Sequence, residues 1–337
     1  MNLVKKILFV VDPHQSQNKI FDNSVSNPVN RDDGTYPFFL LKNKLNALDI
    51  EISTQDMEPL ENADLLLFLD IPLDFTKYSA SLKKYLIITE SELIKPQNWN
   101  LENHKYFEKI FTWNDDFVDN KKYFKLNFSN KIRSTAAENF KRTRFCCLIA
   151  GKKSVNHTLE LYSKRVEAIR WFEKNKPQLF DLYGVGWDLH QFTGPIWLRA
   201  FNRIHFLRQI LAAKFPSYKG KVSSKLQTLL GYQFSICFEN AHGISGYITE
   251  KIFDSLFAGC IPIYWGAPNV TEFIPESCFI DFRKYKNFDE LFDYLINMDQ
   301  KTIIEYQNNI YNYLNSEQVK PFSAEYFAEK LTQEIIT

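Results

Sequence analysis

Residues 238–259, FENAHGISGYITEKIFDSLFAG, gather polar side chains between two apolar segments, QFSICFEN and CIPIYWG, which have the composition of buried strands. From about Thr249 to Ala258 the apolar residues recur at helical spacing, and Gly259 is suited to end that helix. The N-terminus of a helix presents unpaired N–H groups and a partial positive charge. This junction of strand and helix therefore predicts an anion site.

Charged and flexible residues at the same junction extend this prediction. Lys251 would add a full positive charge, and Glu250 can accept hydrogen bonds from the hydroxyls of a ribose. Gly243 and Gly246 would let the backbone approach a ligand closely. A glutamate in a first turn also complements the helix dipole, however, and a lysine is commonly a solvated surface charge. The residues alone leave both interpretations open.

The elements that must position this junction alternate between strand and helix patterns along the whole chain. In the first part, strand patterns occupy residues 7–11, 49–54, 63–70, 84–90 and 110–115, and a helix pattern occupies 38–48. After a polar, basic stretch at 129–143, strand patterns recur at 144–152, 180–187, 233–240 and 260–266, and helix patterns at 159–174, 249–258 and 322–336. This order predicts two α/β domains with parallel sheets, so ligands should bind beyond the carboxyl ends of the strands.

Composition excludes several classes of protein. The 337 residues are 45% hydrophobic and 24% charged, which is ordinary for a globular protein, and the length favours two domains. The formal net charge of +1 gives no global attraction for nucleic acid. The five cysteines have no metal-ligand spacing and favour a reduced, intracellular setting. We find no apolar run of the length that spans a membrane.

The run FENAHGISGYITEKIFDSLFAGCIPIYWGAPN strongly resembles the signature of the α-1,3-fucosyltransferases, glycosyltransferase family 10. The resemblance extends through LYSKRVEAIRWF, FDLYGVGW and YKGKVSSKLQTLLGYQFSICFEN, and it covers the N-terminal part only loosely. It implies the GT-B fold, in which two Rossmann-like domains face each other across a cleft. We expect an acceptor domain at residues 1–137, a GDP-fucose domain at 138–320 and a terminal amphipathic helix at 321–337.

The resemblance also implies the residues that bind the donor. These are Arg165, Lys225, Asn240, Tyr247, Glu250 and Lys251. Arg165 would bind the diphosphate, for which a planar guanidinium is well suited. Without the resemblance, Arg165 would be read as an exposed cation of its helix. Lys251 would contact phosphate and Glu250 the ribose.

The implied reaction inverts the anomeric centre of fucose, so a carboxylate should take the proton of the acceptor hydroxyl. We expect this base in the first domain, across the cleft. Glu90, at the end of the strand in KKYLIITESELIKP, resembles the family's base, and Glu92 is the alternative because it stands where some relatives have a proline.

No convincing D-x-D motif is present, so we expect no obligatory metal, although stimulation by a divalent ion stays open. Asp115 and Asp116 are read as a turn or an acceptor-side contact, and the loop at residues 14–36 as the acceptor loop. The partners are then GDP-fucose and a glycan containing N-acetylglucosamine, with α-1,3 linkage and α-1,4 left open. We expect the soluble bacterial type in the cytoplasm, with peripheral attachment to the inner face of a membrane left open.

Three other interpretations compete with this one. An α/β oxidoreductase or epimerase would need G-x-G-x-x-G after the first strand, but ILFVVDPHQSQNK contains no glycine. A noncatalytic glycan-binding relative is disfavoured by the intact YITEK run and by the carboxylate at position 90. A transferase that uses another GDP-deoxyhexose remains open.

Overall fold

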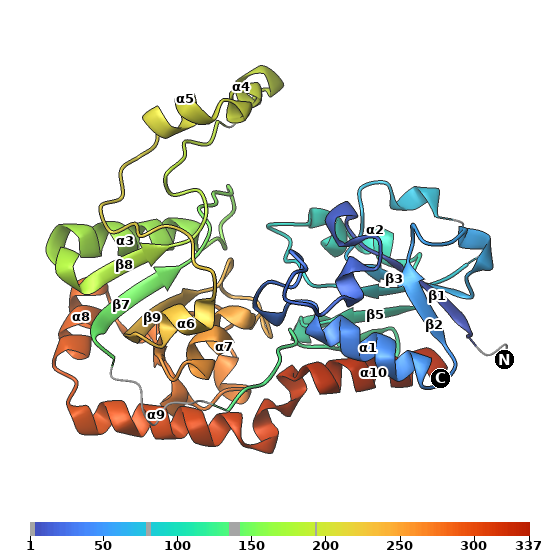
Figure 1. The fold of residues 1–337 in the computed structure, drawn as a ribbon. Helices are drawn as coiled ribbons and strands as arrows, with labels where there is room; N and C mark the ends of the chain where they lie inside the picture. Colours follow the sequence, from blue (N-terminus) through green and yellow to red (C-terminus); the bar gives the residue numbers. More distant parts are fainter. Residues whose placement is uncertain (1–3, 79–81, 135–141, 193) are drawn as a thin grey trace.

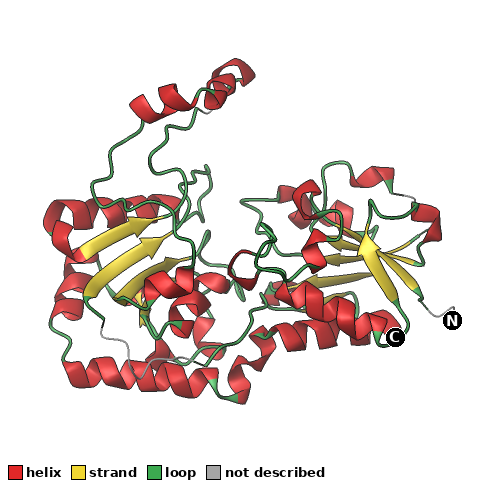
Figure 2. Ribbon diagram, viewed as in Figure 1, coloured by secondary structure: helices red, strands yellow, loops and turns green. Residues whose placement is uncertain are grey.

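The computed structural model describes residues 4–78, 82–134, 142–192 and 194–337. Two α/β domains lie side by side, each built on a sheet of parallel strands with helices packed around it (Figures 1 and 2). This arrangement confirms the predicted fold class. The predicted boundary between residues 137 and 138 lies outside the described residues.

The N-terminal sheet has the strand order β2-β1-β3-β4-β5-β6. Its strands are β1 (Lys6–Val10), β2 (Glu51–Thr54), β3 (Leu65–Leu69), β4 (Lys83–Ile87), β5 (Lys109–Thr112) and β6 (Tyr123–Lys125). All five residues of the central strand β3 are buried, because one hydrophobic cluster covers each face of the sheet. The helices α1 (Tyr36–Asn46) and α2 (Leu101–His104) belong to this domain.

The C-terminal sheet has the order β11-β10-β9-β7-β8. Its strands are β7 (Arg144–Ile149), β8 (Phe180–Tyr183), β9 (Tyr232–Phe238), β10 (Ile261–Trp265) and β11 (Ile280–Asp281). Its helices are α3 (Tyr162–Asn175), α6 (Lys225–Leu229), α7 (Glu250–Phe257), α8 (Phe288–Ile296) and α9 (Gln300–Leu314). β9 pairs with β7 on one side and β10 on the other, so the loop that follows β9 starts at the middle of the sheet edge.

The last helix, α10 (Ala324–Ile336), leaves the C-terminal domain and packs along α1 of the N-terminal domain (Figure 1). The ring of Phe327 meets that of Phe38 edge-on with centroids 5.4 Å apart. Leu331 is fully buried in the same cluster. Lys109 Nζ donates to the Glu334 carbonyl oxygen at 2.6 Å. The end of the chain thus completes the core of the first domain.

Two short helices, α4 (Ile196–Ala200) and α5 (His205–Ile210), extend away from the C-terminal domain (Figure 1). The sequence pattern predicts neither of these helices. Among the described residues, no helix is both long enough and apolar enough to cross a membrane.

Candidate functional site

A cavity of about 280 Å³ lies where the carboxyl ends of β7 and β9 and the start of α7 face the end of β4 in the other domain. Every donor-binding residue expected from the sequence lines it, together with the expected base. These residues are Glu90, Arg165, Lys225, Asn240, Tyr247, Glu250 and Lys251. Glu92 does not line this cavity and is exposed, so the structure separates it from the other candidates.

The helix that opens at the cavity begins as the sequence predicts. Thr249 is the N-cap residue in extended conformation, α7 runs from Glu250 to Phe257, and Gly259 follows with φ 60°. The Thr249 side chain accepts a hydrogen bond from the Lys251 N–H at 3.5 Å. Thr249, Glu250 and Lys251 line the cavity, so the start of α7, where an anion site was predicted, lies on its wall.

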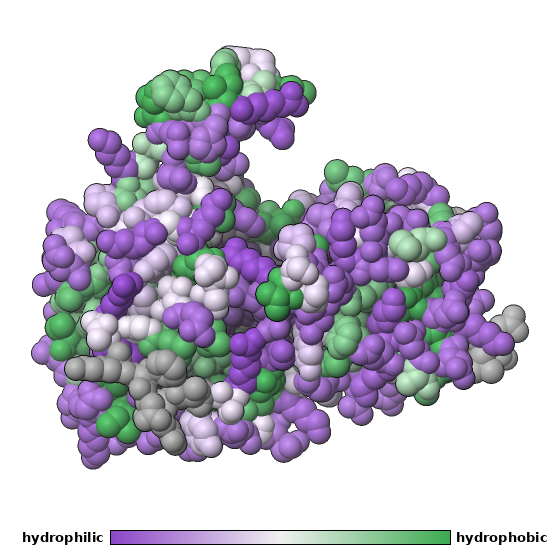
Figure 3. Space-filling model, viewed as in Figure 1, coloured by the Kyte–Doolittle hydropathy of each residue, from purple (hydrophilic) through white to green (hydrophobic). Residues whose placement is uncertain are grey.

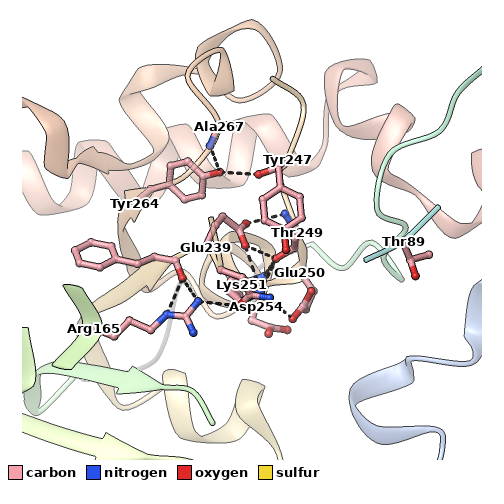
Figure 4. A network of polar contacts seen from close by, with 12 residues as sticks. Thr89, Arg165, Glu239, Tyr247, Thr249, Glu250, Lys251, Asp254, Tyr264 and Ala267 are labelled. Carbon is pink, nitrogen blue, oxygen red and sulfur yellow. Dashed lines mark hydrogen bonds and ion pairs between the residues drawn. The ribbon is translucent and has the colours of Figure 1, made fainter. Parts of the chain in front are cut away.

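A buried carboxylate holds this helix start in place. Glu239, the last residue before the polar loop, is fully buried. Its oxygens accept hydrogen bonds from the Thr249 N–H at 2.8 Å and the Thr249 hydroxyl at 2.7 Å (Figure 4). Lys251 Nζ lies 3.2 Å from Glu239 Oε2 and donates to Thr249 Oγ1 at 2.9 Å. Glu239 thus fixes both the cap and the lysine.

The electrostatics keep Lys251 charged. Burial alone would lower the pKa of Lys251, but the negative charges of Glu239 and Glu250 outweigh it and raise that pKa well above its usual range. Burial would likewise raise the pKa of Glu250, but Lys251 and Lys225 outweigh it and bring the pKa to about 2. The start of α7 is therefore a fixed array of charges at neutral pH.

A second ion pair lies beside the first. Lys225, at the start of α6, places Nζ 2.7 Å from Asp254 Oδ2 of α7. Burial raises the pKa of Asp254 to about 6, with Lys225 acting in the opposite direction. The charge of Asp254 should therefore change near neutral pH.

Arg165 enters the cavity from α3 and is buried, with 4% of its surface exposed. Its guanidinium donates to the Phe238 carbonyl oxygen from Nε at 3.2 Å and from Nη2 at 2.7 Å, and Nη2 also donates to Asn240 Oδ1 at 3.0 Å. Its Nη1 donates to none of the residues that the structure describes. The alternative of an exposed helix cation is therefore wrong.

Glu90 reaches the cavity from the first domain, directly after β4. Its N–H donates to Asp70 Oδ1 at 3.1 Å, and Asp70 also accepts from the Thr89 N–H and from Asn98 Nδ2, both at 2.7 Å. Figure 4 shows Thr89 across the space from Glu250. Burial raises the pKa of Glu90, and Asp70 raises it further.

Tyr247 is fully buried where the two domains meet. Its ring centroid lies 4.6 Å from that of Trp113 in the first domain, and both rings belong to one hydrophobic cluster with Tyr162. The structure thus gives this tyrosine a packing role between the domains as well as a place on the cavity wall.

A second cavity of about 550 Å³ adjoins the first and shares Lys225, Glu250 and Asp254 with it. Residues of the polar loop predicted to bind the acceptor, from Val25 to Gly34, line its other side. That loop contacts the C-terminal domain directly, since Asp32 Oδ1 accepts from the Lys225 N–H at 3.2 Å.

Several site residues escaped the sequence analysis. Glu239, Asp254, Lys153 and Thr249 all border or support the first cavity. Glu239 lies inside the FEN run, directly before Asn240, which was predicted as a site residue. Asp115 pairs with Lys125 and accepts from Asn269 Nδ2 at 3.0 Å, which makes it an interdomain contact. Within the described ranges, no three His, Cys, Asp or Glu side chains converge to hold a metal ion.

Comparisons with known proteins agree with this geometry. Residues 204–333 match the family model for the C-terminal part of glycosyltransferase family 10 (fucosyltransferase). The α-(1,3)-fucosyltransferase FucT of Helicobacter pylori is 46% identical over 74 residues, which is 22% of this chain and 15% of that protein. An α-(1,4)-fucosyltransferase of Arabidopsis thaliana is 41% identical over 64 residues, 19% of this chain and 16% of that protein.

Solved structures extend the likeness to both domains. A crystal structure of an α1,3-fucosyltransferase has a TM-score of 0.55 at 17% identity and covers 98% of this chain and 90% of its own. Anabaena HepE in complex with UDP and glucose has a TM-score of 0.55 at 11% identity, covering 98% and 99%. The fold is that of the GT-B glycosyltransferases. Within that class, the predicted resemblance to the α-1,3-fucosyltransferases of glycosyltransferase family 10 is confirmed.

Proposed function

We propose that this protein transfers L-fucose from GDP-fucose to a hydroxyl of a glycan that contains N-acetylglucosamine, with inversion at the anomeric carbon. The observation that carries the proposal is the composition of the first cavity. Four cations of the C-terminal domain line it together with Glu90 of the N-terminal domain: Lys153, Arg165, Lys225 and Lys251. A leaving diphosphate and an attacking hydroxyl need these two kinds of group on opposite sides.

The steps follow from the positions of these groups. Glu90 accepts the proton of the acceptor hydroxyl while its oxygen forms a bond to C1 of fucose from the face opposite GDP. The bond between C1 and the diphosphate oxygen breaks, and Arg165, Lys251 and the start of α7 stabilise the charge that develops there. The raised pKa of Glu90 suits this role, because a carboxylate with a pKa nearer neutrality is a stronger base.

The names of the relatives support GDP-fucose as the donor more strongly than they support any particular acceptor. Their names include α-(1,3)- and α-(1,4)-fucosyltransferases and a Xenopus laevis GDP-fucose protein O-fucosyltransferase 3, which is 44% identical over 55 residues, 16% of this chain and 12% of that protein. Fucose transfer is common to these names, whereas the acceptor differs. Crystal structures of an α1,3-fucosyltransferase with GDP and with GDP-fucose have TM-scores of 0.53 and 0.54 at 16% and 17% identity.

We infer that the donor and the acceptor bind in different cavities. We assign donor binding to residues 138–320 and acceptor binding to residues 1–137, because the second cavity joins the loop at 25–34 to the donor residues. We expect an α-1,3 linkage, with α-1,4 as the alternative outcome of product analysis. The cations of the first cavity take the place of a divalent ion in this scheme, and a cytoplasmic location remains our expectation.

The direct test is release of GDP from GDP-fucose in EDTA, with and without an N-acetyllactosamine acceptor. We expect release that depends on the acceptor, and linkage analysis of the product then separates α-1,3 from α-1,4. If no glycan in a broad acceptor panel stimulated release, the proposal would be wrong. Turnover with another GDP-deoxyhexose and none with GDP-fucose would show that the other nucleotide sugar is the donor.

Substitution of the base gives the first specific prediction. Glu90→Gln should keep GDP affinity within about twofold but lower the transfer rate by about 10²- to 10⁴-fold, because the amide cannot accept the proton. Calorimetry with GDP and single-turnover transfer measure the two effects. Glu92→Gln is the matched control, since Glu92 is exposed outside the cavity, and it should transfer normally. Loss of transfer in Glu92→Gln alone would reverse the assignment.

A further inference from the structure

A helical projection, residues 194–214, stands out from the C-terminal domain and contains α4, a 3₁₀ turn at Phe201–Arg203 and α5 (Figure 1). None of these three elements buries a single residue. Helical segments this short gain little stability by themselves and normally depend on packing. The projection therefore has a face that nothing else in the described chain covers.

That face is apolar. Ile196, Trp197, Phe206 and Ile210 expose 84%, 66%, 71% and 62% of their surface. Figure 3 shows hydrophobic residues gathered over the projection, with hydrophilic ones on its underside. A single exposed apolar side chain needs no explanation, but a group of large ones on one protruding element marks an interaction surface.

The charge of the projection is equally one-sided. Residues 194–214 contain Arg199, Arg203, Arg208 and Lys214 and no Asp or Glu. The whole chain has a net charge of +1, so the remainder carries −3. Arg199 and Arg203 are exposed, and the side chain of neither forms a hydrogen bond or ion pair with the residues that the structure describes. Cations and large apolar side chains thus occupy the same short element.

We propose that the projection docks this protein on an anionic lipid bilayer, with its apolar face in the interface and its arginines among the headgroups. A bilayer offers an apolar layer and a negative surface together, and short amphipathic elements with Trp, Phe, Leu and Arg bind at that depth. A second copy of the chain fits less well, because a symmetric contact between two projections would bring their cations together.

The two kinds of side chain contribute separately, so each can be removed alone. Arg199→Gln with Arg203→Gln removes two charges and should weaken binding to anionic vesicles roughly 10- to 30-fold, since each surface cation contributes about a fivefold effect. Trp197→Ser with Phe206→Ser removes two large apolar side chains and should weaken binding at least about tenfold. None of the four lines the donor cavity, so GDP affinity should be unchanged.

The experiment is vesicle flotation of the full chain and these variants. Vesicles of phosphatidylcholine alone are compared with vesicles that also contain phosphatidylglycerol, at low and high salt. We expect binding only to the anionic vesicles and release by salt, because exposed charges are screened. Lys44→Gln with Lys174→Gln removes the same charge from exposed positions outside the projection and should bind like the unaltered chain.

Three results would overturn the proposal. The first is absence of binding to anionic vesicles at low salt. The second is that the arginine variant and the lysine variant bind anionic vesicles equally well. Binding would then depend on the net charge of the protein and not on the projection. The third is self-association in light scattering that Trp197→Ser with Phe206→Ser abolishes, which would identify a second copy as the occupant. Unchanged thermal melting of the variants shows that lost binding is not lost folding.

Discussion

Glu90 and Asp254 are carboxylates on the wall of one cavity, and burial raises the pKa of both, yet their protonation should have opposite effects. Glu90 must be deprotonated to accept a proton, so transfer should fall as pH decreases through its raised pKa. Asp254, with a pKa of about 6, repels a bound diphosphate only when it is charged. Affinity for GDP-fucose, whose esterified diphosphate does not titrate in this range, should therefore rise about three- to tenfold as pH falls from about 7 to about 5.

Calorimetric titration of GDP-fucose without acceptor, and transfer at saturating donor, measure these two trends on the same samples. Asp254→Asn should make the affinity for GDP-fucose nearly independent of pH in this range and leave the acid limb of transfer in place. An affinity for GDP-fucose that decreases on acidification would contradict the assignment of Asp254.

Glu239 is the buried carboxylate on which the start of α7 depends. Glu239→Gln keeps the size of the side chain but presents an NH₂ group to donors, and it removes the counter-charge of Lys251. We expect the free energy of unfolding to fall by about 2–4 kcal/mol. Urea denaturation checks this value. The exposed Glu272→Gln should change stability by less than about 0.5 kcal/mol, and an equal loss there would dismiss the argument.

Sequence alone could predict the cations of the site better than the groups that hold them. Lys251 and the helix start follow from local pattern, because capping and dipole act over one turn. The burial of Arg165 and the pairing of Lys225 with Asp254 depend on how α3, α6 and α7 pack, and no local pattern specifies that. The base was narrowed to Glu90 or Glu92, and the structure brings Glu90 alone to the cavity.

At the scale of elements, the sequence predicts the buried strands and the amphipathic helices. It does not predict the short helices that pack against no core or the shortest strands. β3 is a continuous apolar run, β9 is mostly apolar and buried, and α7 has a clear apolar face. The projection escaped because its apolar residues form short helices without a core to face. β6 and β11, with three and two residues, are too short to show a period.

Helix α10 gives a prediction at this scale, because it completes the core of a domain that lies far from it in sequence. Leu331→Ala should lower the free energy of unfolding by about 2–5 kcal/mol, since Leu331 is fully buried against the first sheet. Chemical denaturation measures the loss. Gln333→Ala on the exposed side of α10 is the control and should stay within about 0.5 kcal/mol. A small loss for Leu331→Ala would mean that α10 does not pack on α1 in solution.

At the scale of the whole molecule, the proposed reaction depends on how closely the two domains approach. The Asp115 N–H donates to the Ser245 carbonyl oxygen at 3.3 Å, and the Gly246 N–H donates to Asn269 Oδ1 at 2.9 Å within the same contact. Gly246 has φ 79°, and a Cβ there would overlap the carbonyl oxygen of Trp113 in the other domain. The loop between β9 and α7 thus carries part of the proposed donor site and a contact between the domains that would bring Glu90 to it.

Gly246→Ala should consequently separate the domains, and Gly243→Ala offers a control in the same loop. Gly243 has φ 74°, so an alanine suffers a similar backbone strain of about 1–2 kcal/mol, but its Cβ would meet only Leu159 at 3.9 Å. We expect Gly246→Ala to lower the transfer rate at least about tenfold more than Gly243→Ala, with GDP affinity alike in the two, because displacement of about 1 Å costs about 10²-fold. Equal rates in the two variants would show that strain in the loop, and not the distance between domains, limits transfer.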